Sequence, residues 1–176
     1  DAAIRVIPDP TDGTRGLMYD KRSAWSLAGV ARNRGPATSL RDIEVAVMAE
    51  LPTSKMGWTD VLWAVRGQGV RARRVDLRDG SESSFSLQPS SAATINQGFA
   101  TVSNFFPGTK VLAAELVEFL VRRMIDRADI TRATVFDDQY ISTAGQWYEL
   151  MAGHDRFNAD LRPAFYGMQG MAEGMC

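Results

Sequence analysis

The longest amphipathic pattern in the chain covers residues 109–127. Val111, Leu116 and Leu120 belong to a broad apolar face, while Glu118 and Arg122 fall on the opposite side at three- and four-residue steps. This spacing is typical of an α-helix, and a threonine that follows a Pro-Gly pair can cap its first turn. A helix of this length spans roughly 28 Å and needs neighbours on most of its circumference. The pattern therefore predicts the central helix of a mainly helical domain.

Shorter patterns predict further helices on both sides of this segment. Ser39, with Asp42 three residues later, has the spacing of a capping box at a helix start. Two segments instead look extended, and an Asp79-Gly80 turn between them predicts a β-hairpin. The predicted helices cover residues 23–31, 39–50, 57–65, 92–106, 143–151 and 155–165, and the predicted strands cover residues 71–76 and 83–87.

These elements predict a mainly α fold, with a single helical core domain, one small β-hairpin and extended arms at both ends. The core domain covers residues 23–166, with a polar loop after the central helix. Residues 1–22 contain scattered Pro and Gly and are predicted to form an extended N-terminal arm. Residues 167–176 alternate Gly and Met without a helical period and are predicted to form a C-terminal tail.

The composition excludes several classes of function. The 176 residues carry a net charge of −1 and include one Cys and one His, so an internal disulfide and a Cys- or His-based metal site are excluded. The sequence contains no P-loop, no GxGxxG motif and no GxSxG motif. We expect neither a cofactor nor a metal. Without a long apolar run or a visible signal peptide, a soluble intracellular protein is expected, and the initial Asp suggests a processed or trimmed chain.

Arginine is the candidate binding residue, because seventeen of the 20 basic residues are Arg. Its guanidinium group binds phosphate in a bidentate manner, although a GC-rich coding sequence also produces this bias. The first group surrounds the predicted hairpin, where alternation along the strand divides it between two faces. The second group ends the central helix, where cations also complement the helix dipole. The candidate nucleic-acid-binding residues are Arg66, Arg71, Arg73, Arg74, Arg122, Arg123, Arg127 and Arg132.

Acidic residues offer a second kind of chemistry. Asp137 and Asp138, with two aspartates upstream, could bind a hard cation, but their spacing matches no EF-hand and solvated loop carboxylates are the preferred explanation. Glu115 or Asp137 could serve a carboxylate-dependent enzyme, which would need a concave pocket. His154 lies at a predicted helix boundary, where a structural role is expected.

The order of several short motifs resembles the coat proteins of flexible filamentous plant viruses, most nearly the potyvirus type. The similarity covers about residues 32–172 and includes RGPATSLRD, KMGWTDVLWAVRGQG, DLRDGSESSFSLQP and the WYE of residues 147–149. In that family a Ser, an Arg and an Asp grip the RNA backbone. None of the three is retained here, since the matching places fall near Gly69, near Asn96 and at Gln146.

The resemblance and the arginines lead to one preferred function and two alternatives. The preferred function is a structural coat or nucleocapsid protein, not an enzyme, that self-assembles through its arms and binds single-stranded RNA through phosphate. It would reside in a virion or the host cytoplasm, or in the cytoplasm if the protein is not viral, and would not bind membranes. The first alternative is a winged-helix DNA-binding regulator, because helix, turn, helix and basic hairpin occur in that order. The second alternative is the carboxylate-dependent enzyme.

Overall fold

The computed structural model describes residues 2–105, 107–125 and 135–161, which form two compact units. The first unit comprises residues 1–87 and 142–145, and the second comprises residues 88–141 and 146–176. The described residues form nine β-strands and three α-helices, so the predicted mainly α fold with one core domain is wrong.

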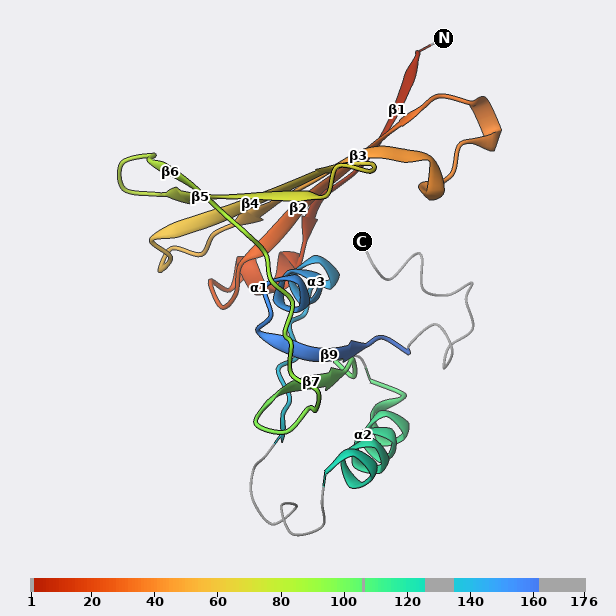
Figure 1. Cartoon of the computed structure of the whole chain (residues 1–176), viewed down its shortest axis with the longest axis vertical. Helices are drawn as coiled ribbons and strands as arrows, with labels where there is room; N and C mark the ends of the chain where they lie inside the picture. The colour runs from red at the N-terminus through yellow and green to blue at the C-terminus, as the bar shows by residue number, and fades with distance from the viewer. Residues whose placement is uncertain (1, 106, 126–134, 162–176) are drawn as a thin grey trace. The chain divides into compact units, whose positions relative to one another are not determined.

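The first unit is built on a six-stranded antiparallel sheet in which neighbours in sequence are neighbours in space (Figure 1). Helix α1 (Thr14–Met18) lies between the first two strands, and short 3-10 turns at Gly35–Ala37 and Leu40–Asp42 lie between the second and the third. The strands are β1 (Ile4–Asp12), β2 (Ala24–Arg32), β3 (Ile43–Leu51), β4 (Trp58–Val65), β5 (Val70–Asp76) and β6 (Glu82–Phe85).

Strands β2, β3 and β4 occupy the segments that were predicted as helices 23–31, 39–50 and 57–65. β-Branched residues alternate along the first half of β3, at Ile43, Val45 and Val47, and such residues favour a pleated strand. Both faces of these strands carry apolar residues, so the sequence also satisfies a helical spacing. The capping box of Ser39 and Asp42 is present, but it closes a 3-10 turn that leads directly into β3.

The predicted N-terminal arm is also wrong, because residues 4–12 form β1 and pair with β2 along most of their length. The predicted hairpin is confirmed by β5 and β6, which pair across the turn that contains Gly80. Gly80 has a φ of 72°, a conformation that glycine adopts without steric cost.

The register divides the sheet into two faces. Met48, Leu62 and Ala72 are directly paired and define what we call the Leu62 face; Leu62 is 2% exposed. The neighbouring positions Val47 and Trp63 are paired with each other and define the Trp63 face. Every strand of the meander contributes to both faces because side chains alternate along it.

The second unit contains a small parallel sheet with the order β8-β7-β9. Its apolar cluster joins Ile95, Ala100 and Ile125, with Val121 and Val135 packed against them. The elements are β7 (Gly98–Val102), α2 (Lys110–Met124), β8 (Val135–Phe136), α3 (Thr143–Met151) and β9 (Asp155–Ala159).

Helices α2 and α3 confirm two sequence predictions, the central helix and the helix 143–151. The predicted helices 92–106 and 155–165 are wrong, because these segments contain β7 and β9. The predicted C-terminal tail, residues 167–176, lies outside the described residues. Among the residues that the structure describes, no helix is both long enough and apolar enough to cross a membrane.

Candidate functional site

Two carboxylates with defined hydrogen bonds lie where β1 ends. We call residues 9–14 the acidic loop; it begins at Asp9, where the pairing between β1 and β2 becomes irregular. Asp9 Oδ1 accepts a hydrogen bond from the backbone N–H of Thr11 at 3.2 Å, and the hydroxyl of Thr14 donates to the carbonyl of Thr11 at 2.6 Å. A β-bulge at this place redirects the side chains that follow it. The loop thus presents two carboxylates, those of Asp9 and Asp12, three residues apart.

Asp12 is held by the start of helix α3. Its Oδ2 accepts hydrogen bonds from the hydroxyl of Ser142 at 2.9 Å and from the backbone N–H of Ala144 at 2.7 Å. The hydroxyl of Ser142 in turn accepts from the backbone N–H of Gly145 at 3.0 Å. No described residue donates to Oδ1 of Asp12. These two hydrogen bonds at the start of the helix give the carboxylate of Asp12 a fixed orientation.

Gly13 is required for the close approach of the loop to this helix. Its φ of 93° lies in the left-handed region, and an added Cβ would come within 3.0 Å of the Cβ of Ser142. A side chain at Gly13 would therefore push Asp12 away from its two donors. The conformation of the loop therefore depends on the backbone of Gly13 as well as on the hydrogen bonds of its carboxylates.

Two carboxylates on one short segment can accept a proton from water or orient a cationic or protic ligand. The described residues contain no group of three or more His, Cys, Asp or Glu side chains that could hold a metal ion. The acidic loop of the described structure is therefore a two-carboxylate centre, and no complete cation site surrounds it.

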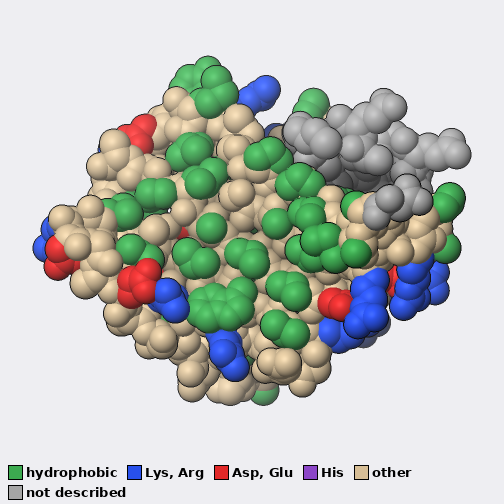
Figure 2. Space-filling model, turned by 90° about the horizontal axis from the view of Figure 1, so that it is seen from above, with side chains coloured by type: hydrophobic (Ala, Val, Ile, Leu, Met, Phe, Trp, Pro, Cys, Tyr) green, Lys and Arg blue, Asp and Glu red, His purple; other side chains and the backbone are tan. Residues whose placement is uncertain are grey.

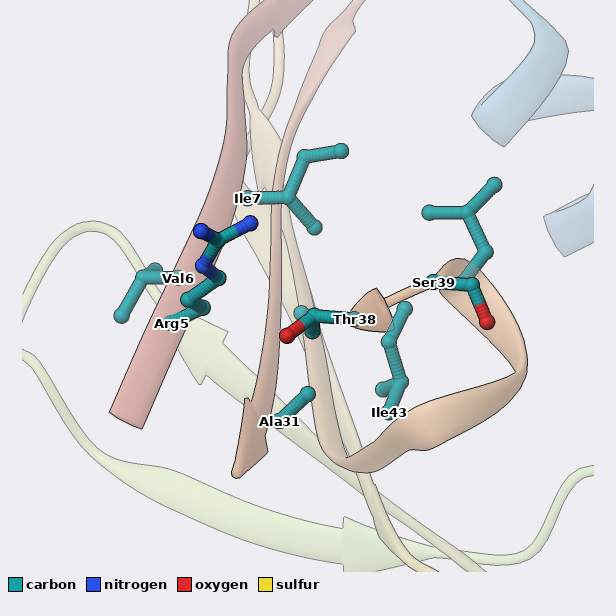
Figure 3. A pocket seen from close by; sticks show the side chains of 9 residues that line it. Arg5, Val6, Ile7, Ala31, Thr38, Ser39 and Ile43 are labelled. Atoms are coloured by element: carbon teal, nitrogen blue, oxygen red, sulfur yellow. The ribbon is translucent and has the colours of Figure 1, made fainter. Parts of the chain in front are cut away.

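A separate cavity of about 420 Å³ opens on the Leu62 face near the other end of β1. Figure 3 shows Arg5 and Ile7 directed toward the segment that carries Thr38, while Val6 points away. The hydroxyl of Thr38 already donates to the carbonyl of Gly35 at 3.0 Å. The described lining thus combines the guanidinium of Arg5 and the side chains of Thr38 and Ser39 with apolar residues, and it includes no carboxylate for hydrolytic chemistry.

The structure places the first group of predicted arginines on both faces of the sheet. Arg74 donates to both carboxylate oxygens of the buried Asp60, at 2.8 and 2.7 Å, from the Leu62 face. On the Trp63 face, Arg73 pairs with Glu82 at 2.6 Å, and Arg71 is exposed beside it.

Arg66, the remaining member of this group, donates through Nε to the carbonyl of Ile43 at 3.0 Å. The predicted division between two faces is therefore confirmed. Three of the four guanidinium groups are engaged with protein groups, which lowers their capacity to bind phosphate.

The second group of predicted arginines lies on α2 and beyond it. Arg122 pairs with Glu118 at 3.4 Å, and the guanidinium of Arg123 stacks over the Phe119 ring at 5.6 Å. Arg127 and Arg132 lie outside the described residues. The two groups belong to different compact units.

Among the other predicted candidates, Asp137 and His154 have structural partners. Asp137 accepts hydrogen bonds from the hydroxyl of Thr101 at 3.0 Å and from Nε2 of Gln139 at 2.8 Å. Nδ1 of His154 lies 2.5 Å from a carboxylate oxygen of Glu149, next to the end of α3. Glu115 is exposed on α2.

The acidic loop was missed by the sequence predictions, which assigned it to an extended arm. The sequence did contain a signal, because the β-branched run of residues 4–7 precedes an Asp-Pro-Thr-Asp-Gly-Thr segment. An extended run followed by two aspartates and a glycine is the pattern of a strand that ends in a carboxylate-bearing turn.

Comparison with known proteins identifies the fold. No protein-family model matches the chain, and no curated protein matches it. Solved structures of Leishmania major fructose-1,6-bisphosphatase share its fold. The match to the T-state structure has a TM-score of 0.56 and 16% sequence identity. It covers 86% of this chain and 47% of the bisphosphatase chain. The match to the apo form has a TM-score of 0.52 and 18% sequence identity, and it covers 86% of this chain and 49% of the bisphosphatase chain. The chain therefore spans about half the length of these proteins.

Proposed function

We propose that the protein acts on a phosphate ester of a small molecule, with the acidic loop as its reactive centre. The main support for this proposal is the fixed orientation of the Asp12 carboxylate at the end of β1. Two hydrogen-bond donors from the start of α3 hold it there. The likeness of the fold to a fructose-1,6-bisphosphatase supports phosphate esters as the substrate class. This proposal replaces Glu115 and Asp137 as the candidate carboxylates of an enzyme.

The proposed reaction is hydrolysis of a phosphate monoester. Asp9 accepts a proton from a water molecule, whose oxygen forms a new bond to phosphorus while the bond from phosphorus to the ester oxygen breaks. The departing oxygen takes up a proton, so the products are an alcohol and inorganic phosphate. Asp12, held in one orientation, positions the water through Oδ1. The described part of the acidic loop supplies these two carboxylates to the proposed reaction.

The test is phosphate release by the purified chain, with fructose 1,6-bisphosphate and simpler sugar phosphates as substrates. Asp9→Asn removes one charge but keeps an oxygen that accepts from Thr11, so the turn should persist. We expect this variant to lower the rate at least about 100-fold, the usual contribution of a general base.

Asp79→Asn is a matched control, because Asp79 Oδ1 also accepts a hydrogen bond from a backbone N–H two residues later, at 2.8 Å from Ser81. Asp79 lies in the β5–β6 turn, and its substitution should leave the rate unchanged. Equal rates in both variants, or no phosphate release by the unmodified chain with any of these esters, would refute the proposal.

The predicted coat-protein function stays a prediction. It requires filaments or shells in negative-stain images and an excess of absorbance at 260 nm over that of the protein alone. The winged-helix alternative has lost its premise, because the two helices it needs are β3 and β4.

A further inference from the structure

The cavity near the start of β1 combines an apolar lining with one unpaired cation, and we call it the Arg5 hollow. It lies between β1, β2 and the segment of residues 33–42 that joins β2 to β3 (Figure 3), and its volume is about 420 Å³. Small-molecule sites usually have volumes of about 300 to 1,000 Å³. The apolar part of the described lining comes mainly from Ile7, Gly29, Ala31, Leu40 and Ile43.

The guanidinium group of Arg5 forms no hydrogen bond or ion pair with any residue that the structure describes. Arg34 and Arg73, by comparison, pair with the carboxylates of Asp42 and Glu82 at 3.2 and 2.6 Å. Figure 2 shows the same habit on one face of the molecule, where several basic side chains stand next to acidic ones. An unpaired guanidinium group that borders a cavity can offer its N–H donors to an anion from solution.

The two hydroxyl groups of the lining are already used within the protein. The hydroxyl of Ser39 donates to Oδ2 of Asp42 at 2.9 Å, and the hydroxyl of Thr38 donates to the carbonyl of Gly35 at 3.0 Å. Because each hydroxyl has only one proton, the guanidinium of Arg5 is the side-chain donor that remains in the described lining. This lining includes no carboxylate that would repel an anion.

The wall formed by residues 33–42 is held in place by hydrogen bonds. Asn33 donates from its backbone N–H to the carbonyl of Ala3 at 3.0 Å and from Nδ2 to the carbonyl of Ala2 at 2.8 Å, which ties this wall to β1. Within the wall, the backbone N–H of Arg34 donates to Oγ1 of Thr38 at 2.8 Å. A ligand therefore meets a wall that is already ordered and loses little affinity to loop ordering.

The floor of the hollow depends on Gly29. A Cβ at this position would lie 2.8 Å from Cδ1 of Ile43 and 3.2 Å from Cγ2 of Ile7. The absence of a side chain lets these two isoleucines approach one another over β2. The floor is thus apolar and closed, while the cation stands at one side.

We propose that the Arg5 hollow binds a monocarboxylate with an apolar body. The guanidinium of Arg5 donates to both carboxylate oxygens, and the apolar body contacts Ile7, Leu40 and Ile43. A single guanidinium group neutralises one negative charge, which favours a carboxylate over the dianion of a phosphate ester. The hollow is therefore a site with a ligand class different from that of the acidic loop.

The probe is octanoate, and its binding to the full unmodified chain is measured by a methyl NMR titration. We expect saturable shifts of the methyl signals of Ile7 and Ile43, with a Kd of about 1 mM. Val70 is 53% exposed on the same face of the sheet but lies outside the lining, so its methyl signals should not move. Equal shifts at Val70, or shifts that do not saturate, would overturn the proposal.

Three further ligands separate the contributions of charge and of the apolar body. Octylamine has the same chain with a positive charge at neutral pH, and butyrate has the same carboxylate on a shorter chain. Each should bind at least about tenfold more weakly than octanoate, and equal affinity of either would contradict the proposal. Displacement of octanoate by an equal concentration of inorganic phosphate would make the hollow a phosphate site and overturn its assignment to monocarboxylates.

A pair of variants tests the role of the cation. Arg5→Gln removes the charge-assisted hydrogen bonds and should weaken octanoate binding at least about tenfold. Arg15→Gln is the matched control, because Arg15 is also exposed but lies on α1, outside the lining, and its substitution should leave binding unchanged. Equal affinities of Arg5→Gln and the unmodified chain would refute the proposal. None of these outcomes depends on phosphate release, so this proposal and the proposed function can fail separately.

Discussion

The carboxylate of Asp60 is 3% exposed and depends on one guanidinium group, that of Arg74, for a bidentate ion pair. Removing the arginine would leave a buried charge with less compensation, which is costly in a low-dielectric environment. Because Arg74 itself is 41% exposed, water can replace part of its effect. We expect Arg74→Ala to lower the free energy of unfolding by about 2 kcal/mol, measured by urea denaturation.

The matched control is Arg78→Ala, which removes a guanidinium from the exposed pair with Asp76. An exposed ion pair is screened by water, so Arg78→Ala should lower the free energy of unfolding much less than Arg74→Ala does. Equal losses in the two variants would show that burial of the carboxylate is not what makes the Arg74 pair important.

The lowered pKa of Asp76 should make the stability of the protein depend on pH. Hydrogen bonds from the side chain of Arg78 and then from its backbone N–H lower the pKa of Asp76 to about 2. A carboxyl group whose pKa falls on folding stabilises the protein above its unfolded pKa, about 3.9, and this contribution is lost as the pH falls toward 2.

We therefore expect the stability of the unmodified protein to fall more steeply between pH 4 and 2 than that of Asp76→Asn. Denaturation curves at several pH values measure this slope. In a carboxyl NMR titration, Arg78→Ala should return the pKa of Asp76 toward its usual value; an unchanged pKa would contradict this account.

At the scale of elements, segments with a single apolar face were predictable and strands with two apolar faces were not. The helix predicted at residues 109–127 is observed as α2. Its charged residues recur at a helical spacing, which a strand would not satisfy. In β3 and β4 both faces carry apolar residues, and such a sequence satisfies helical and strand periods alike. Only the pairing with distant strands decides between them.

The end of helix α3 offers a prediction about backbone conformation. Gly153 has a φ of 78°, and a Cβ on it would overlap the backbone carbonyl oxygen of Gln88. Gly67 has the same φ of 78°, with nothing within 4 Å of an added Cβ. Gly67→Ala should thus cost only the left-handed strain of alanine, about 1 kcal/mol, whereas Gly153→Ala should cost about 2 kcal/mol or more.

Thermal unfolding of the two variants tests this difference. The larger fall in Tm should belong to Gly153→Ala. Equal shifts would mean that the segment around Gln88 moves aside at little cost.

At the scale of the whole molecule, the candidate site combines residues that are far apart in the sequence. The arginines were visible as a composition bias, yet the sequence could not show that Arg73 and Arg74 would each meet a carboxylate. Asp12 and Ser142 meet across 130 positions, and no local pattern encodes such a contact. The sequence does show the aspartates, but their arrangement depends on β1, which was predicted as part of an extended arm.

The contact between Asp12 and the start of α3 should also contribute to the stability of the first unit. Asp12→Ala would leave the hydroxyl of Ser142 and the N–H of Ala144 without their acceptor, at a cost of about 1 to 2 kcal/mol. Asp12→Asn keeps an acceptor oxygen and should cost less. Urea denaturation of both variants measures the difference, and equal losses would assign the effect to charge alone.

The chain leaves the first unit after residue 87 and returns to it for residues 142–145. A recombination joint that falls between residues 88 and 141 would therefore separate the two pieces of this unit and leave Asp12 without the donors that hold it. The acidic loop and the far segment that fixes it are thus expected to be exchanged together or not at all.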